Sequence, residues 1–223
     1  MYSIIKRFFD LIFSVIGLIV ISPLFIPIII ASRLTAEGEV FYRQKRVGYK
    51  ALHFQILKFA TMLKNSPNMK GGSITMRRDP RITPVGHYLR ITKLNELPQL
   101  LNVITGDMSF VGPRPLMPKS FSRYTKEVQS KVYDSKPGIT GIGSIIFRDE
   151  EKMVTEAYEN GIDPEDFYDT VIFPYKGQVE LWYRENRSLW TDFKILVLTA
   201  LAIILPNQKL TDQFFDDLPE RNF

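Results

Sequence analysis

The chain opens with a long apolar segment and then changes to alternating and helical patterns. No charged residue occurs between Asp10 and Arg33, and the run LIFSVIGLIVISPLFIPIIIA is long enough to cross a bilayer as a helix that rises about 1.5 Å per residue. A second apolar run, Ile195 to Leu205, is too short to span and is expected to pack in the core or lie at the membrane interface. The first segment therefore predicts contact with a membrane.

Two prolines argue against a straight rod in this segment. Pro23 and Pro27 each lack a backbone donor, so a bend is expected near Ser22 and Pro23, where the Ser22 hydroxyl can satisfy the freed carbonyl. Basic residues flank both ends of the segment: Lys6, Arg7, Arg33, Arg43, Lys45 and Arg46. Because a true span usually carries positive charge on one side only, residues 1–35 predict a re-entrant helix with both ends in the cytoplasm. A proline-kinked transmembrane helix is the alternative, and a secretory signal is disfavoured by the length of the run.

The rest of the chain predicts an α/β fold that is mostly helical, with a small β-sheet or hairpin. Residues 36–205 are assigned to one compact cytoplasmic domain and residues 206–223 to an acidic C-terminal tail. Short β-prone runs on either side of residues 47–50 predict the hairpin, and the Gly- and Pro-rich stretch 66–86 predicts a long loop. Helices are predicted from Asn95, as an N-cap, to a stop at Gly106, and also over 119–136 and over 149–160 before Gly161.

Composition narrows the partners without choosing one. The 223 residues include 29 Lys and Arg against 24 Asp and Glu, a net charge of +5 that favours an anionic partner. The absence of cysteine excludes disulfides and thiolate chemistry, and two histidines leave little for zinc, whereas a hard cation held by oxygen ligands remains open. No recognition helix accompanies the basic clusters, so membrane lipids rather than nucleic acid are the expected partner.

Two short stretches carry the candidate chemistry. TKLNELPQL, from Thr92 to Leu100, places an amide, Asn95, beside a single carboxylate, Glu96, where two carboxylates would suggest nucleophilic or acid/base chemistry. GDMSFVGPRP, residues 106–115, is a rigid Gly/Pro loop that presents Arg114, whose planar fork of donors suits a phosphate. Alone, such a loop is structural as often as it is functional.

A longer series of motifs resembles a known family. These motifs are Lys6-Arg7, the apolar run with Ser22-Pro23, RQKRVG, LKFATM, DPRITPVGHYLR, NELPQLLNVITGDMSFVGPRP and KPGITG. In this order they resemble the bacterial sugar transferases of the small monotopic phosphoglycosyl transferase type, over residues 1 to about 143 and more weakly to WYRENRSLWTDF. The resemblance also implies the re-entrant bend at Ser22-Pro23.

The resemblance implies a reaction and a place for it. A sugar-1-phosphate passes from a nucleotide-diphosphate (UDP) sugar to polyprenol phosphate, with Mg²⁺, at the cytoplasmic face of the plasma (inner) membrane. A nucleoside monophosphate is released, and the lipid-linked sugar initiates a capsule, exopolysaccharide, O-antigen or glycoprotein glycan. Nucleotide sugar, polyprenol phosphate and membrane lipids are therefore the expected partners. The oligomeric state stays open, with a homo-oligomer as one alternative.

The family's site residues carry over by position, with one departure. The family uses an Asp-Glu pair, in which the Asp is a covalent nucleophile helped by magnesium, and the arginine of GPRP binds phosphate. Glu96 then matches the second carboxylate and a metal ligand, Arg114 the phosphate arginine and Lys58 a further cation for the substrate phosphate. Asn95 occupies the position of the nucleophile and of a metal ligand, and Ala60 stands where the family commonly has arginine.

Three readings stay open at this point. The chain is an active transferase in which Glu96, or as a weaker choice Asp107, supplies the carboxylate, or in which the lipid phosphate attacks directly. It is a non-catalytic homologue that binds nucleotide sugar or lipid phosphate, or that partners an active transferase. Or Asn95 is simply a helix cap and its presence says nothing about activity. The intact loop around Arg114 favours the first reading.

Overall fold

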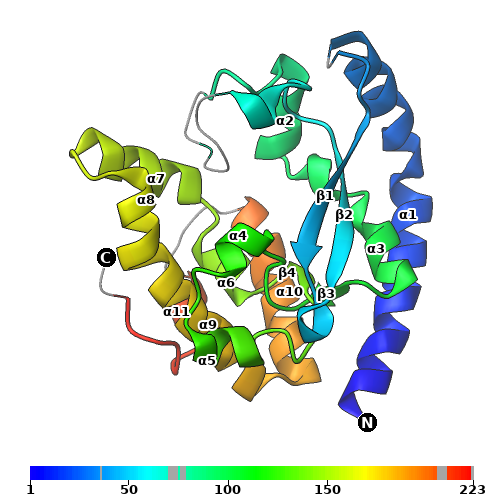
Figure 1. Cartoon of the computed structure of the whole chain (residues 1–223). Helices are drawn as coiled ribbons and strands as arrows, with labels where there is room; N and C mark the ends of the chain where they lie inside the picture. Colours follow the sequence, from blue (N-terminus) through cyan, green and yellow to red (C-terminus); the bar gives the residue numbers. More distant parts are fainter. Residues whose placement is uncertain (36, 70–74, 76–78, 205–209, 222–223) are drawn as a thin grey trace.

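A long N-terminal helix lies along one side of a mostly helical domain (Figure 1). This computed structural model describes residues 1–35, 37–69, 75, 79–204 and 210–221. The helices are α1 (Tyr2–Thr35), α2 (Pro84–Ile91), α3 (Gln99–Thr105), α4 (Pro118–Phe121), α5 (Lys126–Lys131), α6 (Ile142–Ile146), α7 (Glu150–Glu159), α8 (Pro164–Phe167), α9 (Phe173–Asn186), α10 (Leu189–Ile204) and α11 (Leu210–Phe214). The strands are β1 (Phe41–Val47), β2 (His53–Phe59), β3 (Ser109–Val111) and β4 (Gly138–Thr140). The predicted fold class, mostly helical with small sheets, is confirmed.

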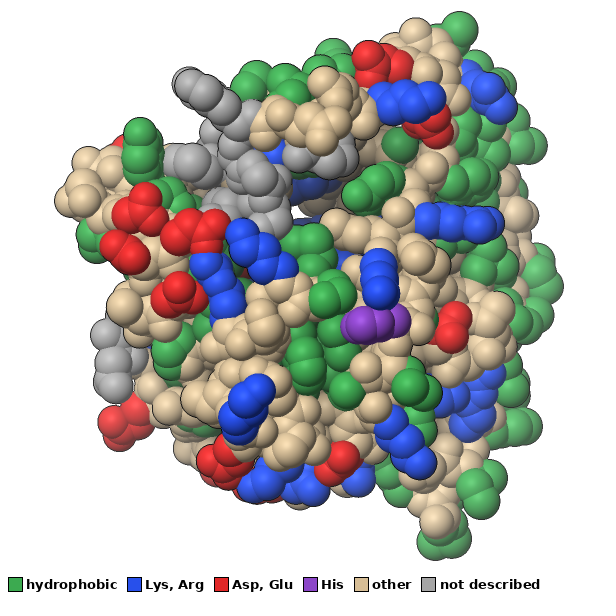
Figure 2. Space-filling view, viewed as in Figure 1, with side chains coloured by type: hydrophobic (Ala, Val, Ile, Leu, Met, Phe, Trp, Pro, Cys, Tyr) green, Lys and Arg blue, Asp and Glu red, His purple; other side chains and the backbone are tan. Residues whose placement is uncertain are grey.

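Helix α1 continues through both of its prolines. Pro23 cannot donate to the carbonyl of Ile19, and the Ser22 hydroxyl donates to that oxygen instead at 2.9 Å, as the sequence predicts. Among the described helices, α1 is the one long and apolar enough to cross a membrane. Figure 2 shows apolar side chains along the edge of the molecule that α1 forms. A largely apolar outer surface on this helix fits membrane association.

Some of the basic residues that flank the apolar segment of α1 bond to the domain. Lys6 forms an ion pair with Asp192 at 2.6 Å, and Arg7 donates to backbone carbonyls at the end of α3. Arg46 donates to the carbonyl of Pro115 at 3.0 Å. The charges of these three residues therefore serve contacts inside the protein. Of the flanking basic residues, Arg33, Arg43 and Lys45 are exposed and free to face lipid headgroups.

Two small two-stranded sheets hold the segments that contain Lys58 and Arg114. β1 and β2 form the predicted antiparallel hairpin, in which Arg46 is opposite Phe54 and Tyr42 is opposite Lys58. β3 and β4 form a parallel pair, and the chain after β3 runs very close to β4. A Cβ atom on Gly138 would lie 2.2 Å from the backbone nitrogen of Gly112, so this approach requires glycine.

The main core lies between α6, α7, α9 and α10. Ile195 and Leu198 of α10 are fully buried there, so the described part of the second apolar run is a core helix, while Leu205 lies outside the described residues. The segment assigned to an acidic tail also packs here. The Phe215 ring meets Trp182 with 5.0 Å between ring centroids, and the Trp182 indole N–H donates to Asp217 at 3.0 Å. Much of residues 210–221 thus belongs to the domain.

Several local predictions need correction. Asn95 is not an N-cap, because α3 begins after Pro98 and Asn95 lies in a preceding 3-10 turn, Leu94–Glu96. The helix predicted over 119–136 is two short helices, because Thr125 caps α5 by accepting from the Val128 N–H at 3.3 Å. Gly106 ends α3 with a φ of 94°, as predicted. Of the stretch 66–86 predicted as a long loop, residues 70–74 and 76–78 lie outside the described residues, and the last three residues already belong to α2.

Candidate active site

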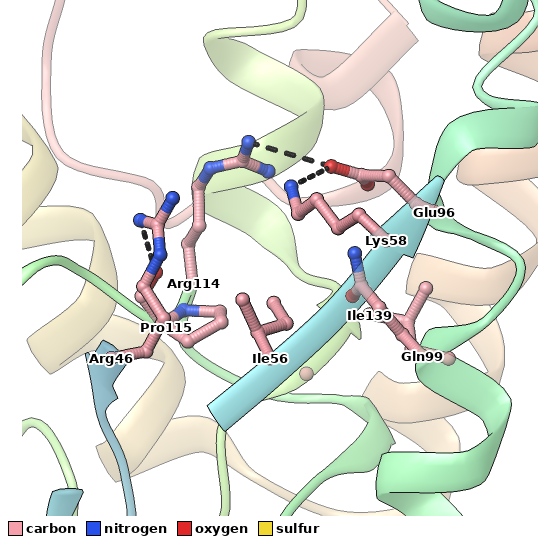
Figure 3. A pocket seen from close by; sticks show the side chains of 9 residues that line it. Arg46, Ile56, Lys58, Glu96, Gln99, Arg114, Pro115 and Ile139 are labelled. Carbon is pink, nitrogen blue, oxygen red and sulfur yellow. Dashed lines mark hydrogen bonds and ion pairs between the residues drawn. The ribbon is translucent and has the colours of Figure 1, made fainter. Parts of the chain in front are cut away.

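Three charged side chains from distant parts of the chain meet in one pocket. The Lys58 Nζ lies 2.6 Å from Glu96 Oε1, and an Arg114 guanidinium nitrogen lies 3.9 Å from the same oxygen. Figure 3 shows the ends of both cations beside this carboxylate, with a dashed line from each to the same oxygen, and with Arg46, Gln99 and Ile139 also in the lining. The structure therefore brings together Lys58, Glu96 and Arg114, the three charged residues singled out from the sequence.

Each of the three stands on a different kind of element. Lys58 projects from β2, which the hairpin holds in register, and Glu96 ends a 3-10 turn that leads into α3. Arg114 follows β3 in a loop fixed by Tyr133, whose hydroxyl donates to the Arg114 carbonyl at 2.8 Å and accepts from Leu116 N–H at 2.9 Å. Preorganised cations of this kind are suited to developing negative charge.

The charges set the protonation states in the pocket. Burial by itself would raise the pKa of Glu96, but the positive charges of Lys58 and Arg114 outweigh it and lower that pKa to about 2. Burial lowers the pKa of Lys58 to about 8, because attraction to Glu96 only partly offsets burial and the repulsion from Arg114. Glu96 is thus an anion at neutral pH, while Lys58 loses its proton just above it.

Arg114 is the most accessible of the three. Its side chain keeps 38% of its surface exposed, against 16% for Lys58 and 17% for Glu96. Burial lowers the pKa of Arg114, but Glu96 and Glu150 more than compensate, so the pKa is raised and the guanidinium stays charged. Its contact with Glu96 is also the longer one. A bound anion could therefore draw Arg114 away from Glu96 at small cost.

Arg46 belongs to the pocket although it was predicted to face lipid. Burial, followed by repulsion from Arg114, lowers the pKa of Arg46 to about 10. The sequence held a signal for this placement, because Arg46 shares strand parity with residues 42 and 44, which pair with Lys58 and Ile56 across the hairpin. Side chains paired in this way lie on one face of the sheet, so Lys58 and Arg46 are expected together.

A second carboxylate stands behind Arg114 and was missed from the sequence. Glu180 of α9 is 3% exposed, and its Oε1 accepts from the Arg114 backbone N–H at 3.2 Å. One turn earlier, the buried Lys176 pairs with Glu150 at 2.6 Å. Burial raises the pKa of Glu180 to about 7, against the hydrogen bond from Arg114 and the charge of Lys176. A Lys and a Glu four residues apart usually lie on an exposed helix face, so the sequence pattern does not predict that Lys176 and Glu180 are buried.

The raised pKa of Glu180 predicts a pH-dependent stability. A carboxyl that titrates at about 7 in the folded state and near 4.5 in the unfolded state stabilises the fold below about pH 4.5, and this contribution is lost as pH rises to 7. We expect the Tm of Glu180→Gln to rise relative to the unmodified protein between pH 5 and pH 8. Thermal unfolding at both pH values tests this, and an equal Tm difference at both would contradict it.

Asn95 and Glu96 are the residues that could hold a metal ion. Asn95 is 8% exposed, and its Oδ1 has no hydrogen-bond partner among the described residues. Mg²⁺ in phosphate-transfer sites typically takes one or two carboxylates, waters and substrate phosphate oxygens rather than a full protein cage. Among the described residues, no group of three or more His, Asp or Glu side chains is arranged so that it could hold a metal ion. Asn95 precedes Glu96 in the chain but is not among the residues that line the pocket, so the fit to a magnesium ion completed by substrate rests on its orphaned amide oxygen and on the ionised carboxylate of Glu96.

Asp107, the weaker choice for a substitute carboxylate, is not in this pocket. It follows α3 at the end opposite to Glu96, and its Oδ2 accepts from the Thr105 hydroxyl at 2.9 Å. The residues that line the pocket do not include it. Glu96 is therefore the carboxylate that remains for the site.

Comparison with known proteins agrees with these observations. A model of the family described as bacterial sugar transferase matches residues 1–206. The chain belongs to the bacterial sugar transferase family. The match includes Lys58, Glu96 and Arg114 and the whole of α1.

Individual relatives cover nearly the whole chain. An exopolysaccharide production protein, ExoY, of Sinorhizobium fredii is 36% identical over 217 residues, which are 91% of this chain and 87% of that protein. The undecaprenyl-phosphate galactose phosphotransferase of Salmonella typhimurium is 34% identical over 90% of this chain, and the UDP-glucose:undecaprenyl-phosphate glucose-1-phosphate transferase of Escherichia coli is 34% identical over 88%. The chain spans only 40% and 39% of the length of these two transferases.

Proposed function

We propose that this protein transfers a sugar-1-phosphate from a UDP-sugar to polyprenol phosphate and so initiates a surface glycan. The observation that carries the proposal is the pocket in which Lys58 and Arg114 face the single carboxylate of Glu96. Relatives named as UDP-glucose:undecaprenyl-phosphate glucose-1-phosphate transferase and as exopolysaccharide production protein support the substrate class and the pathway.

The cations of the pocket bind the diphosphate of the donor. The guanidinium of Arg114 offers paired donors to one phosphate, and Lys58 supplies a compact charge beside it. Arg46 adds a third positive charge at the same wall. Because these side chains are held before substrate arrives, they stabilise the charge that develops on the leaving phosphate.

Glu96 acts through its charge rather than as a covalent nucleophile. The pKa of about 2 and the close ion pair with Lys58 make its oxygens weakly basic, and the Asn95 amide has no nucleophilic oxygen to offer. A phosphate oxygen of the lipid therefore attacks the sugar-bearing phosphorus directly. The new P–O bond forms as the anhydride P–O bond breaks, UMP leaves with that electron pair, and the sugar stays on the lipid as a diphosphate. Any proton on the attacking phosphate passes to water.

Asn95 and Glu96 would hold Mg²⁺ in this reaction. When bound, the ion neutralises diphosphate charge and favours departure of UMP. Asn95 supplies a neutral oxygen donor, and Glu96 supplies the negative charge of the protein part of the site. The ion pair with Lys58 keeps the Glu96 carboxylate in its orientation.

We infer that this reaction takes place at the cytoplasmic face of the plasma membrane, and the apolar helix α1 supports attachment to a membrane. Its outer surface is apolar, and its Ser22 hydroxyl already satisfies the carbonyl that Pro23 leaves free. Such a site allows the helix to bend within the membrane without an orphaned backbone group. We therefore infer a re-entrant, monotopic attachment, which a cysteine-accessibility assay would test by placing both Tyr2 and Thr35 on the cytoplasmic side.

The experiment that tests the function is UMP release by the purified protein. We expect release from a panel of UDP-sugars only when polyprenol phosphate and Mg²⁺ are both present. A stoichiometric burst of UMP without lipid would instead indicate a covalent intermediate and contradict direct attack. Silence of the unmodified protein together with activity of Asn95→Asp would favour a non-catalytic, ligand-binding homologue.

Lys58 gives the reaction an alkaline limit. Because burial lowers the pKa of Lys58 to about 8, its charge and the phosphate binding that depends on it are lost above that pH. We expect kcat/KM to decline above about pH 8, and we expect Lys58→Arg to move this decline to higher pH because arginine keeps its proton. The pH profile of UMP release measures both. An unmoved alkaline limb in the variant would assign the titration to another group.

A further inference from the structure

The first turns of α1 are attached to the domain by charged side chains. Lys6, Arg7 and Asp10 are the charged residues that precede Arg33, and all three bond to the domain. Asp10 is 5% exposed, which is unusual for a carboxylate on an otherwise apolar helix. Burial of such a carboxylate costs free energy unless the carboxylate is paired or hydrogen-bonded.

Asp10 reaches the strand that leads to Arg114. Its Oδ1 accepts from the backbone N–H of Phe110, in the middle of β3, at 3.1 Å. The neighbouring N–H groups of Ser109 and Gly112 instead donate across to the β4 segment. Phe110 therefore presents its N–H on the open side of a two-stranded sheet, where the Asp10 carboxylate takes the place of a further strand. The rings of Phe13 and Phe110 also meet edge to face at 6.4 Å.

The same helix also holds the other side of the pocket. Arg7 donates to the carbonyls of Val103 and Ile104 at the C-terminal end of α3, the helix that follows Glu96. A cation at this end satisfies otherwise free carbonyls and opposes the helix dipole. Figure 1 shows α1 alongside α3, with β3 close to its lower half. Helix α1 thus bonds both to the strand before Arg114 and to the helix after Glu96.

We propose that Asp10 is a positioning residue of the active site, through which α1 fixes β3 and so sets the position of Arg114 relative to Glu96. What this position does for phosphate transfer rests on the proposed function. The membrane helix is then part of the catalytic architecture as well as an anchor. A shift of about 1 Å in a positioned group can cost up to a hundredfold in rate, so a single lost bond to β3 matters.

The test combines hydrogen exchange with binding and kinetics on the full chain in lipid nanodiscs. In Asp10→Leu we expect the Phe110 amide to lose protection at least tenfold, UDP affinity to fall several-fold, and kcat for UMP release to fall about tenfold. Asp10→Asn retains an acceptor oxygen and is expected to rescue all three. Ser14→Ala, a buried change one turn later on the same helix, is the matched control and is expected to match the unmodified protein in all three.

Each outcome decides the inference. Unchanged exchange and UDP affinity in Asp10→Leu would overturn it, and so would rapid exchange of the Phe110 amide in the unmodified protein. If the leucine variant does not fold, Asp10→Ala replaces it with the same expectations. If no variant, the unmodified protein included, releases UMP, the proposed function fails, whereas exchange and UDP affinity still decide the role of Asp10.

Discussion

Replacement of Glu96 by glutamine is expected to lower kcat/KM for UMP release by a hundredfold or more. The change keeps the shape of the side chain and removes the one negative charge that faces both Lys58 and Arg114. Loss of a single preorganised electrostatic group commonly costs about a hundred- to a thousandfold in rate. Lys58 is also affected, because attraction to Glu96 raises the pKa that burial lowers, so the variant's lysine loses its proton at a lower pH.

The matched control for this change is Glu127→Gln. Glu127 also forms an ion pair with a lysine, Lys131 at 2.8 Å, but on the exposed face of α5. A pair of this type contributes little, so activity is expected to stay within twofold. Steady-state UMP release at pH 7 and at pH 8.5 measures both variants. Full activity of Glu96→Gln at pH 7 would show that the carboxylate is dispensable and would move the site elsewhere.

Lys58, Glu96 and Arg114 were predictable because each lies in a short motif of the sequence. Arg114 lies in a Gly/Pro loop, and Glu96 ends the turn before a helix that Gly106 ends. The prediction that they share one site came from the resemblance to a family, because hydrophobic periodicity alone does not bring these three residues together. The elements themselves followed from simple patterns, such as strand alternation on both sides of residues 47–50.

What the sequence could not show are the contacts made across long stretches of chain. Glu180 bonds to a residue 66 positions away, and Asp10 to one 100 positions away. A charged residue on a helix is predicted to face water unless a partner is known, and no local pattern identifies such a partner. The prediction that Asn95 is an N-cap failed for a different reason, because α3 begins only after Pro98 and Asn95 lies in the preceding 3-10 turn.

Substitution of Arg114 by lysine tests whether the fork, and not only the charge, binds the substrate. Lysine keeps one positive charge but loses the planar pair of donors. We expect kcat/KM for the UDP-sugar to fall by about a hundredfold, with UDP affinity reduced as well, because the fork engages phosphate both before and during transfer. The backbone bonds of residue 114 to Tyr133 and Glu180 do not depend on its side chain, so the loop should keep its place.

The control for this substitution is Arg184→Lys, on the surface of α9. Arg184 also makes a charged contact, with Asp134 at 2.8 Å, but it lies outside the pocket lining. Its replacement is expected to change kcat/KM by less than twofold. Titration with UDP and steady-state UMP release separate binding from turnover for both variants. Unaltered UDP affinity and turnover in Arg114→Lys would mean that a point charge suffices, and the phosphate would then be held mainly by Lys58 and Arg46, whose side chains line the same wall.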